Sequence, residues 1–403
     1  MKNPEDLYDA LLDPKTREAA LSELAPRGDT LYGIPQLERD QKRKLLSLDL
    51  FGGYGWGPVF NQFMGGGLSP GDLVGVGAAS AGAGKTAFLM QLADGFALRC
   101  QRVLSNSERG PLTPVLLLSE LSPDTLARRQ LAWSVEVPGY LPSVAIFRAG
   151  NEHPDNKPLY EEARRLLRTN GDAVELGGSA GRVFQIRQWQ RQVSQSRFVA
   201  KAREMAKRTQ FSFSFSLVGL LRFVISEWRA LLEAEYGREV WPILILDPVQ
   251  RWQESGRNEL ESLNELARAL DDAADQDGFI VFFSSDTNKT SAKGELDGDP
   301  MEVGAGLFRG SYTLLHCADV ALYLARPEGD PKDPVRIVPV RLFKNRHGQS
   351  FGEALFRWRP RTGRFVPLSE LEADKIKADL TALKLSATKN KPNGKRPAGE
   401  DAG

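Results

Sequence analysis

One short stretch constrains the fold of this chain more than any other. An apolar run, LVGVGA (residues 73 to 78), is followed by the small residues ASAGAG and then by Lys85 and Thr86. The run is typical of a buried parallel strand, and apolar residues at three-and-four spacing over 85 to 99 predict a helix. A strand, a glycine-rich turn and a helix in this order bind phosphate groups, because backbone N–H groups and the helix N-terminus face the anion.

We therefore predict a phosphate loop that binds ATP and Mg²⁺. Lys85 would reach the β and γ phosphates, and the Thr86 hydroxyl would contact Mg²⁺. Ala79 stands where the usual pattern has glycine, which matters only if that position needs a positive φ. The alternative is a chance glycine-rich turn. The predicted nucleotide-binding residues are Ala79, Ser80, Ala81, Gly82, Ala83, Gly84, Lys85, Thr86 and Ala87.

Two further apolar runs end in acids. WPILILD (241 to 247) ends in Asp247, and PVLLLS (114 to 119) is followed by Glu120. Because ligands of open parallel sheets gather at the carboxyl ends of strands, we predict that Asp247 holds Mg²⁺ together with Thr86. Glu120 is our candidate for orienting or deprotonating the attacking water. Its alternative role is that of a helix-capping acid ahead of SPDTLARRQLA.

The remaining pattern predicts an α/β fold. FIVFFSS (279 to 285) reads as another buried strand, and helical patterns cover 218 to 237 and 258 to 274. DVALYLAR, VRIVPVRLF and GEALFRWRP predict later strands joined by turns, and the strict alternation of FSFSFS (211 to 216) would add one more.

We expect three regions. Residues 1 to 48 contain short helical patterns broken by proline and glycine and form an arm that would link subunits. Residues 49 to 368 form the ATPase domain, with a polar surface elaboration at about 151 to 182. Residues 369 to 403 form a C-terminal helix and a disordered basic tail.

Composition limits the setting. The 53 Lys and Arg balance 52 Asp and Glu, so any nucleic-acid contact must come from local clusters. The two cysteines lie far apart, which excludes a disulfide framework and a cysteine zinc site and fits a reducing cytoplasm. No stretch has the pattern of a secretory signal or a membrane span. We expect a cytoplasmic protein with no zinc and no membrane contact.

The order of four motifs resembles the RecA-like ATPase domain of DnaB-type replicative DNA helicases. GLSPGDLVGVGAASAGAGKTAFLMQLA resembles the phosphate-loop region of that family, in which alanine often stands at the position of Ala79. VLLLSELSPDTLARRQLAWSVEVP is similar to its second strand and following helix, and LILDPVQRW to its strand ending in Asp, here Asp247 and then Gln250. FKNRHG is similar to its Lys-Asn-Arg-x-Gly hairpin. The resemblance covers about residues 58 to 367.

The resemblance implies a RecA-like P-loop NTPase core with a mostly parallel central sheet, helices on both faces and a C-terminal β-hairpin. It implies a homo-oligomer, a hexameric ring that acts on single-stranded DNA as a helicase. Lys344 and Arg346 of the hairpin would reach the γ-phosphate bound to the neighbouring subunit. Without the resemblance, KNRHG reads as a basic surface turn.

The sequence departs from this family at three places. The family's catalytic glutamate usually sits one residue later than Glu120, at what is here Leu121, and its glutamine sensor corresponds to Asp286. Asp286 beside phosphates would need Mg²⁺ or a lysine such as Lys289 as a partner. We keep Gln250 and Asp286 as sensor candidates. Residues 1 to 48 are too short for the family's primase-interacting domain.

Two alternative functions remain open. RadA/Sms-type recombination ATPases share the GGGLSPG approach and the KNRxG hairpin, but their four-cysteine zinc element and protease-like domain have no counterpart in this sequence. A non-motor RecA-fold ATPase, a switch or loader in a mobile element or defence system, would use ATP to control assembly. The acid at 286, the position of Glu120 and the many acids in the loop 288 to 310 favour this class, and the intact hairpin favours the motor.

Two segments are candidates for binding nucleic acid. The glycine-rich loop 288 to 310 carries cations that nearby acids oppose, and the window 180 to 210 combines cations with aromatic residues. The alternative for the window is a solvated helix face with inward aromatic side chains. The basic tail would add non-specific attraction or only solubility. The candidate residues are Lys289, Lys293, Arg309, Arg187, Arg191 and Lys201.

Overall fold

The structure is a computed structural model, and it describes residues 66–78, 82–105, 109–122, 125–126, 129, 132, 181–186, 217–252, 258–286, 307–309, 312–328, 332–348 and 352–378. The chain divides into Met1–Leu45 and Leu46–Gly403, and every described residue belongs to the second unit. The predicted arm at 1 to 48, the strand at 211 to 216 and the tail beyond 378 lie outside the described residues, as does nearly all of the elaboration at 151 to 182.

The described residues form one mixed sheet, in the order β3-β2-β4-β5-β1-β6-β7-β8-β9. The strands from β3 to β6 in this order are parallel, and β7, β8 and β9 continue the sheet as antiparallel strands. Their bounds are β1 Leu73–Ala78, β2 Val115–Ser119, β3 Gly181–Gln185, β4 Ile243–Asp247, β5 Ile280–Ser284, β6 Val320–Leu324, β7 Arg336–Asn345, β8 Gly352–Arg359 and β9 Arg364–Pro367.

Helices connect the parallel strands. The described ones are α5 Lys85–Leu104, α11 Leu217–Tyr236, α12 Glu259–Asp275 and α15 Tyr312–Cys317, with a short 3-10 helix at Val249–Arg251 and helical residues at 370 to 378. α12 shows why its sequence is helical. The Asn258 side chain accepts a hydrogen bond from Glu261 N at 3.0 Å, and buried residues recur at three-and-four spacing, as in Leu263, Leu266 and Leu270.

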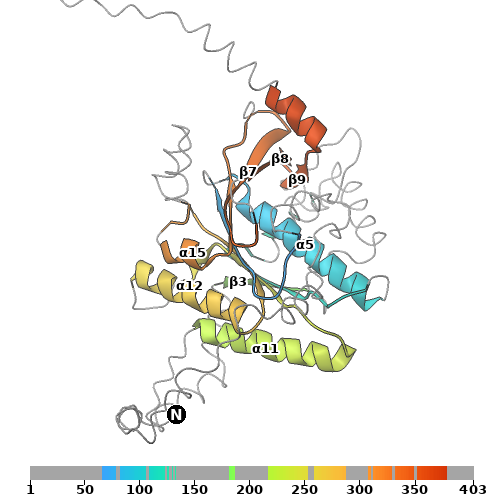
Figure 1. Cartoon of the computed structure of the whole chain (residues 1–403), viewed down its shortest axis with the longest axis vertical. Coiled ribbons are helices and arrows are strands. Elements are labelled where there is room, and N and C mark those ends of the chain that lie inside the picture. The colour runs from blue at the N-terminus through green and yellow to red at the C-terminus, as the bar shows by residue number, and fades with distance from the viewer. Residues whose placement is uncertain are drawn as a thin grey trace, which may run out of the picture. The chain divides into compact units, whose positions relative to one another are not determined.

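The sheet separates two apolar cores, because alternate side chains of each strand point to opposite faces. In β4, Ile243 and Ile245 pack with α5, whereas Leu244 and Leu246 pack with residues of α12. Figure 1 shows α5 on one side of the sheet and α11, α12 and α15 on the other. The predicted α/β fold with a mostly parallel sheet, helices on both faces and a C-terminal hairpin is therefore confirmed.

Two strands were not predicted. β3 pairs in parallel with β2, so residues 181 and 182, placed in a surface elaboration by the sequence pattern, instead begin a strand at the end of the sheet. Its sequence, GRVFQ, lacks the unbroken apolar run of a central strand, because an end strand pairs on one side alone. β9 has only the residues RFVP and gives no periodic signal.

Two glycines of β1 let a distant segment lie close against the strand. A Cβ atom on Gly75 would clash with Phe308 Cζ and would lie 2.6 Å from Phe283 Cζ. A Cβ atom on Gly77 would be 2.8 Å from the backbone oxygen of Leu307. Leu307 and Phe308 are buried, so the segment 307 to 309 is fixed against β1 on the face opposite α5.

We expect Gly75→Ala to lower the free energy of unfolding by about 1–3 kcal/mol, because the methyl group overpacks a filled site. Urea denaturation followed by circular dichroism measures this change. Replacing Phe308 with Leu in the same chain removes part of the contact, so the double variant should lose less than the sum of the single variants. Strict additivity, or a fully stable Gly75→Ala protein, would contradict this packing.

Candidate nucleotide-binding site

The turn before α5 has a backbone that favours glycine. Gly82 and Gly84 have φ values of 86° and 95°, in the left-handed region. A Cβ atom on Gly84 would also be 2.7 Å from Phe365 Cζ in β9. Gly84 is the N-cap of α5 and has no side chain that could cap the helix, and the first turn carries no acidic residue, which suits an anion at this helix end. Ala79, Ser80 and Ala81 lie outside the described residues.

Asp247 ends β4 and is 1% exposed. Ser284 Oγ donates a hydrogen bond to Asp247 Oδ1 at 2.5 Å, and Ser119 Oγ lies 3.5 Å from Oδ2. Burial raises the pKa of this carboxyl, while hydrogen bonds from Ser284 and Thr86 and the charge of Lys85 oppose the rise. The structure thus brings Thr86 and Asp247 together, and a hydroxyl with a carboxylate is the kind of oxygen set that Mg²⁺ takes.

Glu120 lies beside Asp247 at the same edge of the sheet. Its backbone N–H donates to Asp247 O at 2.8 Å, and its carboxylate accepts a hydrogen bond from Arg251 Nε at 2.7 Å. Leu121, at the position of the family's glutamate, instead packs against the apolar core of α5. Ser122 Oγ, rather than Glu120, accepts the Thr125 N–H at the next helical turn. Ser122 thus caps one N–H of this turn.

Two arginines near these acids were not predicted. Arg251 follows Asp247 by four positions and pairs with Glu120. Burial lowers the pKa of Arg129, and the charges of Asp247 and Glu120, which lie near it, oppose this effect. No sequence pattern assigns either arginine to the site, and only the folded chain brings them to the strand ends.

Asp286 pairs with the phosphate-loop lysine. Its Oδ1 atom lies 2.8 Å from Lys85 Nζ, and the two side chains are 47% and 12% exposed. The sequence predicts that an acid here needs a cation such as Mg²⁺ or Lys289. In the structure the cation is Lys85, and Lys289 lies outside the described residues.

The Gln250 side chain is hydrogen-bonded to Asp286 and to two residues near it. Its Nε2 atom donates to Ser285 Oγ at 2.6 Å and to Arg309 O at 3.0 Å, and its Oε1 atom accepts the Asp286 N–H at 3.2 Å. Arg309 N in turn donates to Asp286 O at 2.5 Å. The two sensor candidates, Gln250 and Asp286, are therefore in direct contact.

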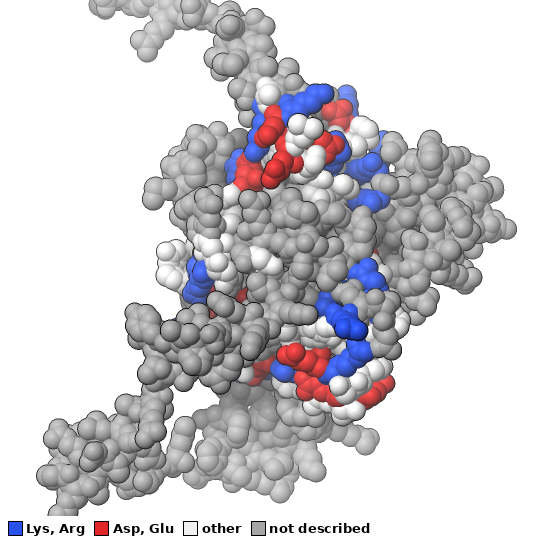
Figure 2. All heavy atoms as spheres, turned by 45° about the vertical axis from the view of Figure 1, so that its right-hand side comes forward, with Lys and Arg blue, Asp and Glu red and all other residues white. Residues whose placement is uncertain are grey.

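Of the nucleic-acid candidates, the structure describes Arg309 alone. It is exposed and lies at the carboxyl edge of the sheet, next to Asp286. Figure 2 shows positive and negative side chains of described residues next to one another on one face. The other candidates, Lys289, Lys293, Arg187, Arg191 and Lys201, lie outside the described residues.

The predicted hairpin is present, and its cations lie at the amino ends of the parallel strands, opposite the carboxyl ends where Asp247 lies. Lys344 lies near the end of β7 and Arg346 in the turn towards β8. Lys344 Nζ donates to the backbone oxygens of Leu315 and His316, at 2.9 and 2.7 Å. Arg346 donates to Asp319 Oδ1 and to His316 O, both at 2.8 Å. Burial lowers the pKa of Lys344, and the charge of Arg346 adds to this effect.

The amino ends of these strands are far from the subunit's own phosphate loop. Asp319 immediately precedes β6, and β6 runs parallel to β1, so the hairpin cations lie at the amino ends of these strands. The phosphate loop follows the carboxyl end of β1, which has six residues and spans about 20 Å at about 3.3 Å per residue. Lys344 and Arg346 therefore cannot serve the nucleotide site of their own chain.

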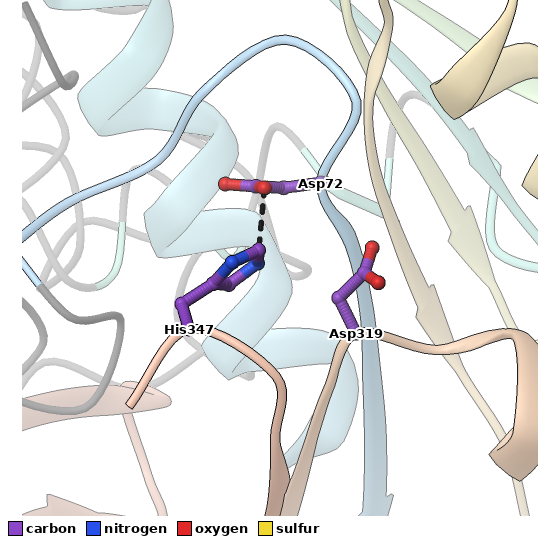
Figure 3. Close-up of side chains that lie close together, drawn as sticks. All are labelled: Asp72, Asp319 and His347. Atoms are coloured by element: carbon purple, nitrogen blue, oxygen red, sulfur yellow. Dashed lines mark ion pairs between the residues drawn. The ribbon is translucent and has the colours of Figure 1, made fainter. Parts of the chain in front are cut away.

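Three side chains meet beside the hairpin. Figure 3 shows His347 directed at Asp72, with Asp319 next to them. His347 Nε2 lies 3.1 Å from Asp72 Oδ1, and the ligand atoms of the three residues lie within 4.8 Å of one another, close enough to surround a metal ion. Asp319 already accepts hydrogen bonds from Arg346 and from Leu73 N. A metal ion would have to compete with these bonds, so we assign the cluster a structural role.

We expect the pKa of His347 to lie above its usual value of about 6.5. The hydrogen bond to Asp72 is the main cause, burial opposes it, the charges of Asp72 and Asp319 add to it and Arg346 reduces it. Because the folded-state pKa is raised, the contact stabilises the hairpin fully below about pH 6.5 and is lost as pH rises through the folded pKa. Histidine NMR titration measures this value, and Asp72→Asn should return it towards normal. A pKa at or below the usual value in the unmodified protein would refute the ion pair.

Comparisons with known proteins agree with this fold. A solved structure whose title describes it as an ATPase domain is similar over 89% of this chain and 100% of that chain, with a TM-score of 0.51 and 16% sequence identity. A second, titled "The Structure Of A DnaB-Like Replicative Helicase And Its Interactions With Primase", covers 91% of this chain and 74% of that chain, with a TM-score of 0.52 and 16% identity. No protein-family model and no curated protein matches the sequence. The chain shares the fold of DnaB-type ATPase domains.

The fold likeness confirms the resemblance that the four motifs indicated. At this identity it concerns the fold, and the activity must be argued from the site. Among the described residues, no helix is long and apolar enough to cross a membrane.

Proposed function

We propose that this chain is an ATP-hydrolysing DnaB-like DNA motor that assembles as a ring with nucleotide between subunits. One observation carries the proposal. The phosphate-binding residues Lys85, Thr86 and Asp247 meet at the carboxyl ends of the parallel strands. The hairpin cations Lys344 and Arg346 lie at the amino ends of these strands. A site that needs both sets is complete only between two copies of the chain. Hexamer formation, single-stranded DNA as the track and Mg²⁺ dependence are parts of this proposal.

The residues at the carboxyl edge would divide the work of hydrolysis. Lys85 and the N-terminus of α5 bind the phosphates, and Thr86 with Asp247 holds the Mg²⁺ that neutralises their charge. Glu120 orients the attacking water, and its bond to Arg251 fixes the direction of its carboxylate. Ser284 and Ser119 hold Asp247 in place.

The hairpin would complete the neighbouring subunit's site. Cations supplied at the γ-phosphate stabilise the charge of the transition state, and supplying them from another subunit couples hydrolysis to assembly. Arg346 is half-exposed, with 52% of its side chain accessible, so it can exchange Asp319 for a phosphate of the neighbour.

A second candidate is a non-motor switch or loader, in which ATP controls assembly. It is favoured by the acid that pairs with Lys85. This contact must be rearranged before the lysine can bind phosphate, which suits slow hydrolysis better than rapid cycling.

We expect ATP hydrolysis that single-stranded DNA stimulates. Lys85→Ala should abolish nucleotide binding, whereas Glu120→Gln should keep binding and lower kcat by about 10²-fold or more, because it removes the base. Phosphate release with and without DNA measures turnover, and Lys375→Ala, an exposed lysine near the C-terminal end of the described residues, is the matched control. Hydrolysis that DNA does not affect would reject the motor and favour the switch. Full activity in Lys85→Ala would reject the site.

A mixing experiment tests whether the hairpin acts on a neighbour. We expect Arg346→Ala to lower kcat by about 10³-fold, as loss of an arginine finger does. Mixed with Lys85→Ala subunits, it should regain activity, because an intact phosphate loop then meets an intact Arg346 from the other variant. The mixture of Lys85→Ala with Glu120→Gln Arg346→Ala subunits is the control, since no interface there is complete. No recovery in the first mixture would show that Arg346 does not act between subunits.

A further inference from the structure

The contact between Lys85 and Asp286 has a consequence for nucleotide binding. Lys85 is largely buried, and its ammonium group lies against the Asp286 carboxylate at 2.8 Å. Under the proposed function, on which this inference rests, the same ammonium group binds the β and γ phosphates. A carboxylate and a phosphate are both anions and repel each other at one cation, so the two cannot share Lys85 at low energetic cost.

The backbone around Asp286 is held from several directions. Gln250 accepts its N–H, Arg309 donates to its C=O, and the neighbouring Ser285 donates its own N–H to Val76 O at 3.0 Å. The side chain itself is 47% exposed, so it can turn away from Lys85 while the backbone stays bonded. The fold therefore places this carboxylate against Lys85, and the exposed side of the carboxylate allows it to rotate away.

We propose that Asp286 is a built-in competitor of the nucleotide phosphates. It neutralises Lys85 in the nucleotide-free subunit, lowers the affinity for ATP and ADP, and must be displaced when either binds. The backbone oxygen of Asp286 stays bonded to the Arg309 N–H, so the displacement is a movement of the side chain alone.

The first test is an equilibrium titration with fluorescent ADP and ATP analogues. Asp286→Asn keeps the shape and removes the charge, and it should tighten binding by about three- to tenfold, as loss of one partly exposed competing ion pair allows. Asp286→Glu keeps the charge and should bind like the unmodified protein. Asp272→Asn is the matched control. Asp272 is 49% exposed and, like Asp286, pairs with a cation, here Arg222, but this pair joins α12 to α11. Thermal unfolding of each variant confirms that it is folded.

Titrations with Mg²⁺ and with EDTA separate this role from metal binding. A competitor acts in both conditions, so Asp286→Asn tightens binding in both. Weaker binding of Asp286→Asn in Mg²⁺ alone would make Asp286 a metal ligand and overturn the proposal, as would unchanged affinity. If the unmodified protein binds no nucleotide, or Lys85→Ala binds as well as it does, the proposed function itself fails. The two failures are therefore distinguishable.

Hydrogen exchange tests whether the side chain of Asp286 moves without its backbone. The Arg309 backbone N–H donates to Asp286 O, so slow exchange at this amide should persist when nucleotide displaces the Asp286 carboxylate. Faster exchange at Arg309 in the nucleotide-bound protein would show that the backbone moves as well and would contradict a displacement of the side chain alone.

Discussion

The buried carboxylate of Asp247 is the constraint on which the rest of the site depends. A charge removed from water costs several kcal/mol unless other groups compensate it. Here the compensation comes from neighbouring strands and from the phosphate loop: Ser119 lies opposite Asp247 in the β2 and β4 register, and Ser284 ends β5. A one-residue slip of either strand would turn these hydroxyls to the other face. The register of the central strands and the position of Thr86 at the start of α5 therefore both contribute to compensating the same carboxylate.

The parts of the site that follow strand ends could be predicted from the sequence. Asp247 is the last residue of β4, Glu120 directly follows β2, and Thr86 lies after the loop that follows β1. Parallel strands bring such positions together at their carboxyl ends. The strand LVGVGA was predicted with its observed bounds. An unbroken apolar run was sufficient because these strands are buried on both faces.

The partners of these residues could not be predicted in the same way. Lys85 and Asp286 are 201 residues apart, and Glu120 and Arg251 are 131 apart, so no local pattern connects them. Asp72, Asp319 and His347 meet because β1, β6 and β7 are neighbours in the sheet. β3 and β9 were missed for a related reason: strands at or near the end of a sheet lack the long apolar runs that reveal central strands.

Each cation that the proposed function assigns to phosphate already has a partner in the single subunit. Lys85 has Asp286, Arg346 has Asp319, and Lys344 has two backbone oxygens of α15. Nucleotide binding and ring closure would therefore exchange contacts rather than add them, and the net free energy is a difference between two sets of similar interactions. Such a balance is close to neutral, so a change at one partner shifts it in either direction. Under the proposed function, a subunit built in this way holds its cations in place before assembly and releases each of them when a competing anion binds beside it.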